Sequence, residues 1–489
     1  MSLLSLHFIL FIIVFQLIFF TVSVFKKSSS TIQKVLLLCA NIYFYTWFGI
    51  GALIVICAMI LVSYLMYNLI RKNKSKGNLI LGIFVSLVPL FATRAVQNIL
   101  EALIDISENE EIVFSEPIKS IIAPIGISFF TLKIISFLVD SYKGSISEKV
   151  SMFDYAIYVS FFPTIISGPI DRPNPFLSQL NKVKSFNSEI WIRGLLISLS
   201  GYIEKMIIAD RLGVIVNYVF GNHAGYKGLP LFLTSILYSL QIYLDFSGYT
   251  LIVCGVAYSM GFICNKNFLQ PYFSRNTREF WHRWHVSFSE WLRDYIYIPL
   301  GGSREGNSKR LRNIIITFLV SGLWHGLGLN YIFWGFLHGI YQVIGIVTEK
   351  AREKAYRKIK VFDTGIHRFM QIIVTFMLVN FAWVFFWCSK SLFQGFEIIS
   401  EMFDGGLVYF NWIFDSGITG TEVKIMIAAG ILVFIIDYLR YKKVDVLKKY
   451  FSLNVVCRFI IVYILFVAII LFGFTSDSFD MKDFIYFNF

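Results

Sequence analysis

The side chains best suited to chemistry in this sequence are its histidines, because a neutral imidazole is the usual general base near neutral pH. Four of the seven histidines fall within 57 residues: His282, His285, His325 and His338. His325 stands between a tryptophan and a glycine in an otherwise apolar segment, where an ionisable side chain is a candidate functional residue. Taken alone, it could equally be a structural histidine bonded to a neighbouring helix. His338 lies in a similar apolar segment, and we interpret it as structural.

A second group of candidates lies between Arg275 and Arg312, where cations, acids and aromatic side chains are mixed. An amphipathic helix in the cytoplasmic interface would explain this composition. It explains less well why two histidines, an Arg-Asp pair and the sequence PLGG fall within 21 residues. The aromatic residues recur every three or four positions, which predicts one helical stripe made of Trp281, Trp284, Phe288, Trp291 and Tyr295.

Other kinds of reactive site find little support. His282 and His285 stand three positions apart and could share a metal ion, but no further ligand follows at suitable spacing, so we expect no metal site. The six cysteines form no C-x-x-C pair, and we expect free thiols. A Gly-x-Ser-x-Gly elbow, a Walker loop and a glycine-rich dinucleotide motif are all missing from the sequence. Asp245, within YLDFSGY, could be a proton relay, a counter-ion or a polar contact between helices.

The elements that must hold these residues are membrane helices. Of the 489 residues, 56% are hydrophobic and 15% are charged, with a mean hydropathy of +0.67. A soluble domain usually carries about 25% charged residues. This composition therefore excludes a soluble globular enzyme, a disordered chain and a disulfide-rich secreted module. We predict an all-α polytopic integral membrane protein that forms one domain over residues 1–489, because no repeat or low-complexity linker divides it.

Apolar runs predict about ten to twelve spanning helices, since each span needs about 20 mostly apolar residues. The first run, 3–25, lacks the charged start and the cleavage site of a signal peptide. The other runs cover residues 33–48, 52–70, 78–97, 118–139, 153–170, 229–263, 366–387, 423–438 and 454–474.

The loops predict an orientation, because cytoplasmic loops collect lysine and arginine. This rule also accounts for the net charge of +13, so we expect no nucleic acid as a partner. The alternation places the basic loops in the cytoplasm and both termini outside. The basic loops are 26–34, 71–76, 349–360 and 440–449, and the acidic or neutral segments are 101–116, 400–422 and the tail after residue 474.

The segment around His325 predicts an unusual hairpin. Arg312 and the basic stretch 349–360 should both be cytoplasmic, yet only about 36 residues separate them, whereas two full spans need about 40. We therefore expect a short hairpin or a re-entrant pair over 313–347, turning near SGLWHG. Irregular backbone at membrane depth is tolerated only where protein buries it or water reaches it, so we expect a cavity near His325.

Six sequence motifs occur in order within about residues 120–345. They are PIGISFF at Pro124, FFPTIISGPIDRP at Phe161, LQIYLDFSGY at Leu240, EFWHRWHVSFSEWLRDYIYIPLGG at Glu279, SGLWHG at Ser321 and FWGFLHG at Phe333. Together they resemble the membrane-bound O-acyltransferases, and most closely the bacterial branch of the alginate O-acetyltransferase membrane subunit.

This resemblance implies the fold of that family, with short or re-entrant helices around a central cavity. It also implies catalytic roles for His325, in SGLWHG, and for His285, in the Arg-Trp-His element. The residues that we expect to bind substrate are Trp284, Arg283, Asp245 and Trp324.

The chain departs from the family pattern at two places. His282 stands where relatives usually have another polar residue, so no role is carried over to it. Thr250 and Leu251 stand where relatives often have Ser-Asp, which leaves the role of an acidic residue in this region open.

The resemblance further implies acyl transfer through the membrane plane. The expected donor is a cytoplasmic thioester, acetyl-CoA or an acyl carrier, and no cofactor is expected to stay bound. His325 would take the proton of an acceptor hydroxyl. Expected partners are the lipid bilayer, a separate extracytoplasmic or membrane-anchored acetyltransferase, and a polysaccharide acceptor of the cell envelope, reached directly or indirectly. The expected location is the bacterial cytoplasmic (inner) membrane.

Three alternatives stay open. The teichoic-acid D-alanylation proteins share the Arg-Trp-His element and a Trp-His-Gly motif and use a D-alanyl carrier protein, although the sequence YIPLGG at Tyr297 favours the acetyltransferase branch. A polysaccharide transporter without chemistry would fit the many spans and the broken hairpin, although no internal repeat supports it. A structural scaffold for a secretion complex is the third alternative.

Overall fold

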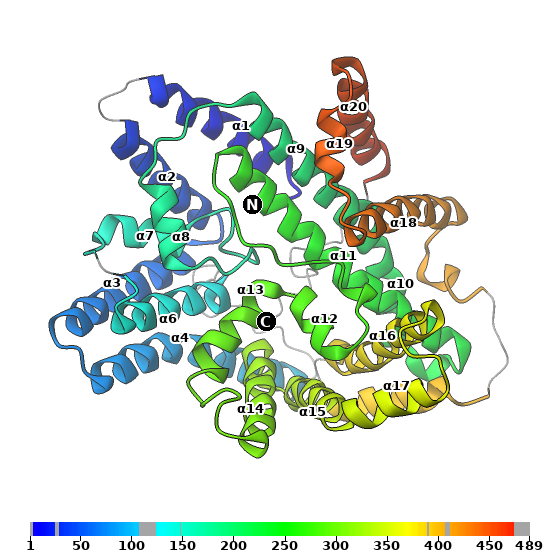
Figure 1. Cartoon of the computed structure of the whole chain (residues 1–489). Coiled ribbons are helices and arrows are strands. Elements are labelled where there is room, and N and C mark those ends of the chain that lie inside the picture. The colour runs from blue at the N-terminus through cyan, green and yellow to red at the C-terminus, as the bar shows by residue number, and fades with distance from the viewer. Residues whose placement is uncertain are drawn as a thin grey trace. The chain divides into compact units, whose positions relative to one another are not determined.

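The computed structural model describes residues 3–24, 29–106, 124–146, 148–388, 391–405 and 411–473. All regular secondary structure in these residues is helical, as the sequence predicted (Figure 1). The described chain divides into two compact units, one built from residues within 3–198 and 250–265 and the other from 199–249 and 266–473. The chain passes from one unit to the other within α9 (Ser188–Tyr202), within α11 (Leu229–Ser259) and after residue 265.

The first unit packs apolar helices side by side. Figure 1 shows α3, α4 and α6 next to one another, and residues of all three are in mutual contact. Every residue of α6 from Ile127 to Val139 is buried, which makes α6 the inner helix of this group. The helices of the unit are α1 (Leu6–Thr21), η1 (Val22–Val24), α2 (Ser29–Thr46), α3 (Ile50–Lys72), α4 (Lys76–Ile106), α6 (Ile127–Lys143), α7 (Met152–Ser160) and α8 (Pro173–Leu180).

The second unit contains all the candidate catalytic residues. Two of its elements, η2 and η5, are π-helices, which are rare and often mark functional sites. The helices of this unit that precede His282 and His285 are η2 (Ile203–Ala209), α10 (Asp210–Gly221), η3 (His223–Gly225), α11 and η4 (Pro271–Phe273). The remaining helices are α12 (Thr277–Arg283), α13 (Val286–Leu292), η5 (Arg293–Tyr297), α14 (Asn307–His325), α15 (Leu329–Lys358), α16 (Gly365–Trp387), α17 (Leu392–Met402), η6 (Phe414–Ser416), α18 (Gly420–Tyr441), α19 (Val446–Phe451) and α20 (Val455–Phe472).

Seven described helices are long and apolar enough to cross a membrane. Apart from Leu229–Ser259, which is mostly buried, these helices expose most of their apolar side chains, and α20 buries none of its side chains. Apolar exposure on this scale fits contact with lipid rather than with water. The chain is therefore a multi-pass membrane protein. The seven are Leu6–Val24, Ile50–Lys72, Lys76–Leu100, Leu229–Ser259, Leu329–Lys358, Gly365–Trp387 and Val455–Phe472.

Some of the shorter apolar runs form helices outside this set of seven, or no single helix. The runs 33–48 and 423–438 form α2 and α18, which are not among the seven. The run 153–170 is not one helix, because α7 ends at Ser160 and turns follow. Pro163 disfavours helical backbone in the residue before it, which accounts for an end at this place. Several orientation signals, namely Lys26, Lys27, the acidic residues within 107–123 and the tail after 473, lie outside the described residues.

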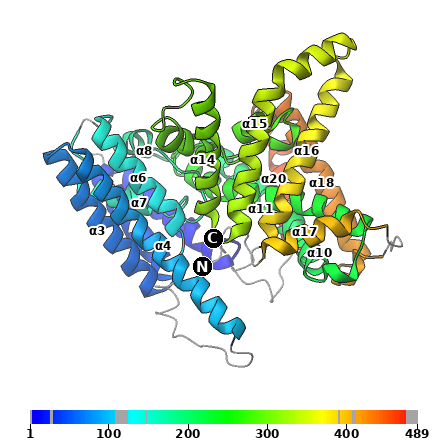
Figure 2. The ribbon, with the colours of Figure 1, turned by 90° about the horizontal axis from the view of Figure 1, so that it is seen from below.

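The hairpin predicted over 313–347 is present. α14 and α15 are joined by the three residues 326–328 and lie side by side (Figure 2). Gly322 and Gly335 allow this approach, because a Cβ at either position would collide with a backbone carbonyl of the opposite helix. The basic stretch that starts at residue 349 was predicted to be a loop, but α15 continues through it to Lys358.

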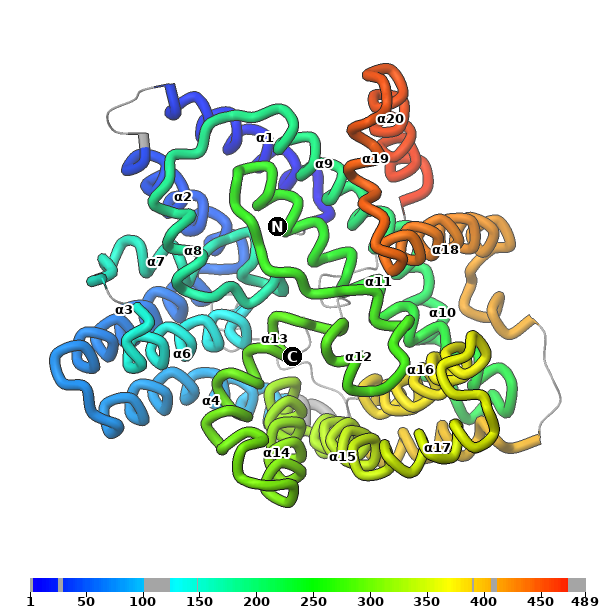
Figure 3. Tube along the Cα trace, in the orientation of Figure 1, coloured from blue at the N-terminus to red at the C-terminus, as the bar shows by residue number. Residues whose placement is uncertain are grey.

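The aromatic stripe predicted for 281–295 is not one helix. α12 ends at Arg283, α13 starts at Val286, and Figure 3 follows them as two separate short coils. The prediction is wrong because tertiary hydrogen bonds replace helical ones at the break. The Leu269 N–H donates to the Arg283 carbonyl, and the Val286 N–H donates to the Asn267 carbonyl, each at 2.9 Å.

Candidate functional site

His325 is the last residue of α14, directly before the hairpin turn. Its side chain is 2% exposed, so the ring is inside the protein. Aromatic rings surround it, with centroids 4.8 Å away for Trp324, 5.1 Å for both Trp334 and Phe386, and 5.9 Å for Phe288. The imidazole therefore lies in a mainly apolar enclosure formed by α13, α14, α15 and α16.

His285 occupies the break between α12 and α13. It is the N-cap residue of α13 and adopts a left-handed backbone conformation with φ 42°, which is uncommon for a residue other than glycine. The neighbouring backbone pairing with Asn267 and Leu269 holds this conformation, and the Ser287 hydroxyl adds a 2.6 Å hydrogen bond to Asn267 Oδ1. Such strain persists only where the surroundings fix it, and it is often found at functional sites.

The two histidines meet at the same aromatic side chains. His285 lies 5.0 Å from Phe288 and 6.2 Å from Trp324, measured between ring centroids. Both rings also contact His325, and they pack on each other at 4.3 Å. The fold thus brings together His285, His325 and Trp324, three of the residues selected from the sequence.

The backbone surroundings of the two histidines differ in their electrostatics. His325 ends a 19-residue helix, where the partial negative charge of the helix C-terminus stabilises a positive charge that the imidazole gains. His285 stands at the start of a helix, and burial lowers its pKa to about 3. His285 is therefore neutral at physiological pH, whereas the position of His325 suits an imidazole that takes up a proton.

Trp284 has surroundings distinct from those of the histidines. It caps the C-terminus of α12, is 1% exposed and packs on Trp383 at 4.9 Å and on Phe280 at 5.5 Å. Its other ring contacts are with Tyr243, Phe268 and Tyr272. The described contacts of Trp284 are those of a core residue that anchors the end of α12.

Arg283 braces the same segment. Its guanidinium donates two hydrogen bonds to Glu279 Oε1, at 2.8 and 3.0 Å, and one to the Leu269 carbonyl at 3.0 Å. It also lies over the ring of Tyr441. These contacts hold the C-terminal end of α12, which directly precedes the break at His285.

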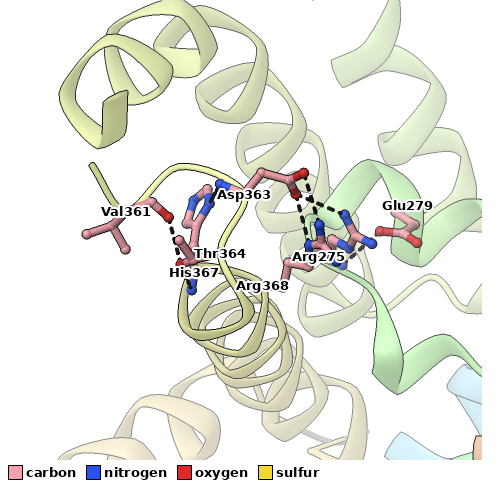
Figure 4. Close-up of polar contacts among 7 residues, drawn as sticks. All are labelled: Arg275, Glu279, Val361, Asp363, Thr364, His367 and Arg368. Atoms are coloured by element: carbon pink, nitrogen blue, oxygen red, sulfur yellow. Dashed lines mark hydrogen bonds and ion pairs between the residues drawn. The ribbon is translucent and has the colours of Figure 1, made fainter. Parts of the chain in front are cut away.

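A polar network continues from Glu279 to the turn between α15 and α16 (Figure 4). Glu279 accepts a hydrogen bond from the Arg275 N–H at 2.9 Å, and the Arg275 guanidinium lies 4.0 Å from Asp363. Asp363 also accepts two hydrogen bonds from Arg368, at 2.9 and 3.0 Å, and its own N–H donates to His367. These contacts link the start of α12 to the start of α16.

Asp245 is part of a buried ion cluster. Its carboxylate pairs with Lys205 at 2.5 Å, and Lys205 also pairs with Asp210 at 2.7 Å. The three side chains are at most 5% exposed. Of the three roles considered from the sequence, the contact between helices is visible, because it joins α11 to the π-helix η2.

His282 differs from the other histidines of this region in being exposed, near the end of α12. Its pKa is lowered by partial burial and by the nearby Arg278 and Arg293. Among the described residues, no group of three or more histidine, cysteine, aspartate or glutamate side chains could hold a metal ion.

Sequence reasoning missed several neighbours of the site. Trp334 and Phe386 form walls of the His325 enclosure, and nothing in their spacing to His325 marks them in the sequence. Lys205 was also missed, although its place in the apolar segment GYIEKMIIAD, together with Glu204, is a signal that could have identified a partner for Asp245.

Comparison with known proteins identifies the family to which this site belongs. The MBOAT, membrane-bound O-acyltransferase family, matches residues 35–393. The probable alginate O-acetylase AlgI of Pseudomonas putida is 32% identical over 413 residues, which cover 82% of this chain and 81% of that protein. The peptidoglycan O-acetyltransferase of Helicobacter pylori is 30% identical, covering 76% of this chain and 73% of that protein. The teichoic acid D-alanyltransferase of Bacillus subtilis is also 30% identical, covering 55% and 70%. The chain therefore belongs to the membrane-bound O-acyltransferase family and is a membrane-embedded O-acyltransferase.

Proposed function

We propose that this acyltransferase moves an acetyl group from cytoplasmic acetyl-CoA to a hydroxyl on the route to an exported or cell-envelope polysaccharide, with His325 as the general base. The observation that carries the proposal is the meeting of His325 and His285 at Phe288 and Trp324, inside one aromatic enclosure. His325 lies at a helix C-terminus, which favours a positive charge, and suits the role of base. His285 lies at a helix start, is neutral, and suits the role of its partner.

The depth of His325 supports transfer within the membrane. His325 lies 13 residues beyond Arg312 in α14, which corresponds to about 20 Å at a rise of about 1.5 Å per residue. If the basic end of α14 is cytoplasmic, the histidine is deep in a hydrocarbon layer of about 30 Å. The donor then has to reach it from one face and the acceptor from the other.

The chemical step is an ester-forming acyl exchange. An imidazole nitrogen of His325 takes the hydroxyl proton while the hydroxyl oxygen attacks the thioester carbonyl carbon. The new C–O bond forms, the C–S bond breaks, and the leaving thiolate takes the proton back from the imidazolium. The products are an acetyl ester and the free thiol, so no proton is gained or lost overall.

Three features of the site favour this step. A positioned base typically contributes about 10²–10⁴-fold to the rate. The C-terminal end of α14 stabilises the imidazolium that forms. The aromatic enclosure excludes water, which protects the thioester from hydrolysis. His285, which is neutral, orients the donor or assists the transfer.

We infer the donor from the basic residues of the chain and the partners from its similarity to known acyltransferases. The basic residues between Arg275 and Arg312 suit a phosphorylated carrier such as acetyl-CoA. Relatives named alginate O-acetylase and peptidoglycan O-acetyltransferase favour acetyl transfer to an envelope polymer in the cytoplasmic membrane of a bacterium. A separate, exported or membrane-anchored acetyltransferase would complete the transfer to the polymer.

D-alanyl transfer from a carrier protein is the second candidate, because relatives named teichoic acid D-alanyltransferase match part of the chain. Their match covers 55% of this chain or less, compared with 82% for the alginate O-acetylases. Acetyl transfer is therefore the better supported of the two. A transporter without chemistry is set aside, since the family is one of acyltransferases.

The experiment uses purified protein in lipid vesicles with radiolabelled acetyl-CoA. Wild type is expected to turn over the thioester or to transfer label, and His325→Ala to lose this activity at equal protein level. His223→Ala is a matched control, because His223 pairs with Glu401 and none of its described contacts involves the aromatic enclosure. Normal turnover by His325→Ala would refute the assignment of the base, and turnover only with a D-alanyl carrier protein would refute the acetyl donor.

A further inference from the structure

His338 is a buried histidine that the proposed mechanism does not use. It lies in α15 and is 0% exposed. Aromatic rings enclose it, with Trp334 at 5.0 Å, Trp281 at 5.1 Å and Tyr341 at 5.8 Å between centroids. A polar side chain enclosed in this way costs folding free energy unless it gains a specific contact. The sequence alone indicated a structural residue.

One hydrogen bond fixes the state of this imidazole. The Trp281 indole N–H donates to His338 Nδ1 at 3.2 Å. An indole nitrogen can only donate, so Nδ1 is the unprotonated nitrogen and Nε2 carries the proton. The bond therefore requires a neutral His338 in one tautomer and one ring orientation, and it joins α12 to α15.

Trp334 connects this imidazole to His325. Trp334 and His338 are four residues apart in α15 and share one face of the helix. The Trp334 ring stands edge-on to both histidines, 5.0 Å from His338 at an interplanar angle of 71° and 5.1 Å from His325 at 90°. Trp334 therefore forms one wall of the His325 enclosure and also packs directly against His338.

We propose that His338 is a positioning residue for acyl transfer, which orients the general base His325 through Trp334 and is itself held by the hydrogen bond from Trp281. This inference rests on the proposed role of His325 as the base. Interior packing is too dense for one ring to turn without displacing its neighbours. A change in the His338 ring is therefore passed to Trp334 and from there to the plane of the His325 imidazole.

The test separates the hydrogen bond from the ring volume. His338→Phe keeps a ring but removes the acceptor, whereas His338→Asn keeps an acceptor oxygen near the place of Nδ1. Trp281→Phe removes the donor from the other side. We expect His338→Phe and Trp281→Phe to lower kcat by about 10- to 100-fold, with KM for acetyl-CoA nearly unchanged, because misplacing a reacting group slows chemistry more than binding. His338→Asn should restore most of kcat.

A double variant provides the sharpest comparison. If the two residues act as one unit, Trp281→Phe combined with His338→Phe will be no slower than either single variant. Wild-type kcat in His338→Phe would overturn the proposal, as would equal losses in the Asn and Phe variants or multiplied losses in the double variant. Should His338→Phe fail to fold, Trp281→Phe measures the same bond.

Two controls make the outcome specific. His223→Phe, which changes a histidine paired with Glu401, should keep wild-type kcat. His325→Ala in the same assay separates the two proposals. An active His325→Ala refutes the base, and with it the positioning of that base. An inactive His325→Ala together with a fully active His338→Phe refutes the positioning role alone.

Discussion

Two buried polar clusters in the second unit have opposite designs. Lys205 is neutralised by Asp210 and Asp245 at 2.7 and 2.5 Å, so its charge is fixed in one ion cluster. The histidine cluster is built of aromatic rings, which enclose His325 at the end of α14. A buried ion pair resists a change in protonation, because removing one partner leaves a buried charge. In the proposed mechanism His325 gains and loses a proton, and the C-terminal end of α14 stabilises its charged form, so the second cluster is the proposed place for chemistry.

Removal of the base is expected to have the largest effect on activity. His325→Ala should lower acyl transfer by about 10²–10⁴-fold, the usual contribution of a general base. Truncating a buried ring also leaves a cavity, so a modest loss of thermal stability in detergent is expected beside the loss of rate. Rates from labelled acetyl-CoA, normalised to folded protein, check this. A His325→Ala variant that loses stability but keeps its rate per folded molecule would show that His325 is structural, like the Lys205 ion cluster.

Breaking the ion cluster is expected to act on stability instead. Lys205→Ala leaves two buried carboxylates without their shared cation and should lower the free energy of unfolding by about 3–5 kcal/mol. The measurement is thermal or denaturant unfolding in detergent, compared with the activity of the fraction that stays folded. Asp245→Asn is the informative companion variant. A raised KM at unchanged stability would give Asp245 the substrate role expected from the sequence.

The pH dependence of stability tests the environment of His285. Its pKa is about 3 in the folded protein, below the usual value of about 6.5 for histidine. Between these two values the unfolded chain binds a proton that the folded protein does not. Stability should therefore fall as the pH is lowered from about 6.5 toward 3, by at most about 1.4 kcal/mol per pH unit from this group, and stay constant above. His285→Gln should have a flatter profile, and parallel profiles for the two proteins would contradict this.

The smallest effect is expected from the partly exposed ion pair between Glu279 and Arg283. Glu279→Gln removes the charge that pairs with Arg283, whose side chain is 23% exposed. Such pairs contribute about 0.2–1 kcal/mol, so unfolding should change only slightly, and less at high salt. A large loss of activity with normal stability would instead show that Arg283 acts on substrate directly.

Much of the architecture could be predicted from local sequence. Membrane helices follow from run length and apolar content, because lipid solvates apolar side chains along a whole helix. The hairpin followed from the spacing of two basic stretches, and its turn falls directly after His325. The candidate histidines followed from the Trp-His-Gly motif at His325 and the Arg-Trp-His motif at His285. These features depend on neighbours in the chain, which a sequence displays.

The sequence by itself determined that the chain is helical and membrane-embedded, and it singled out His325 and His285 as candidates for chemistry. Only the tertiary structure decided that the helix breaks at His285, that Lys205 neutralises Asp245, and that Trp334 stands between His325 and His338. Helix periodicity predicted a continuous stripe, but hydrogen bonds to Asn267 and Leu269 overrode it. Contacts between residues far apart in the chain leave no fixed spacing in a sequence, and these contacts set the geometry of the site.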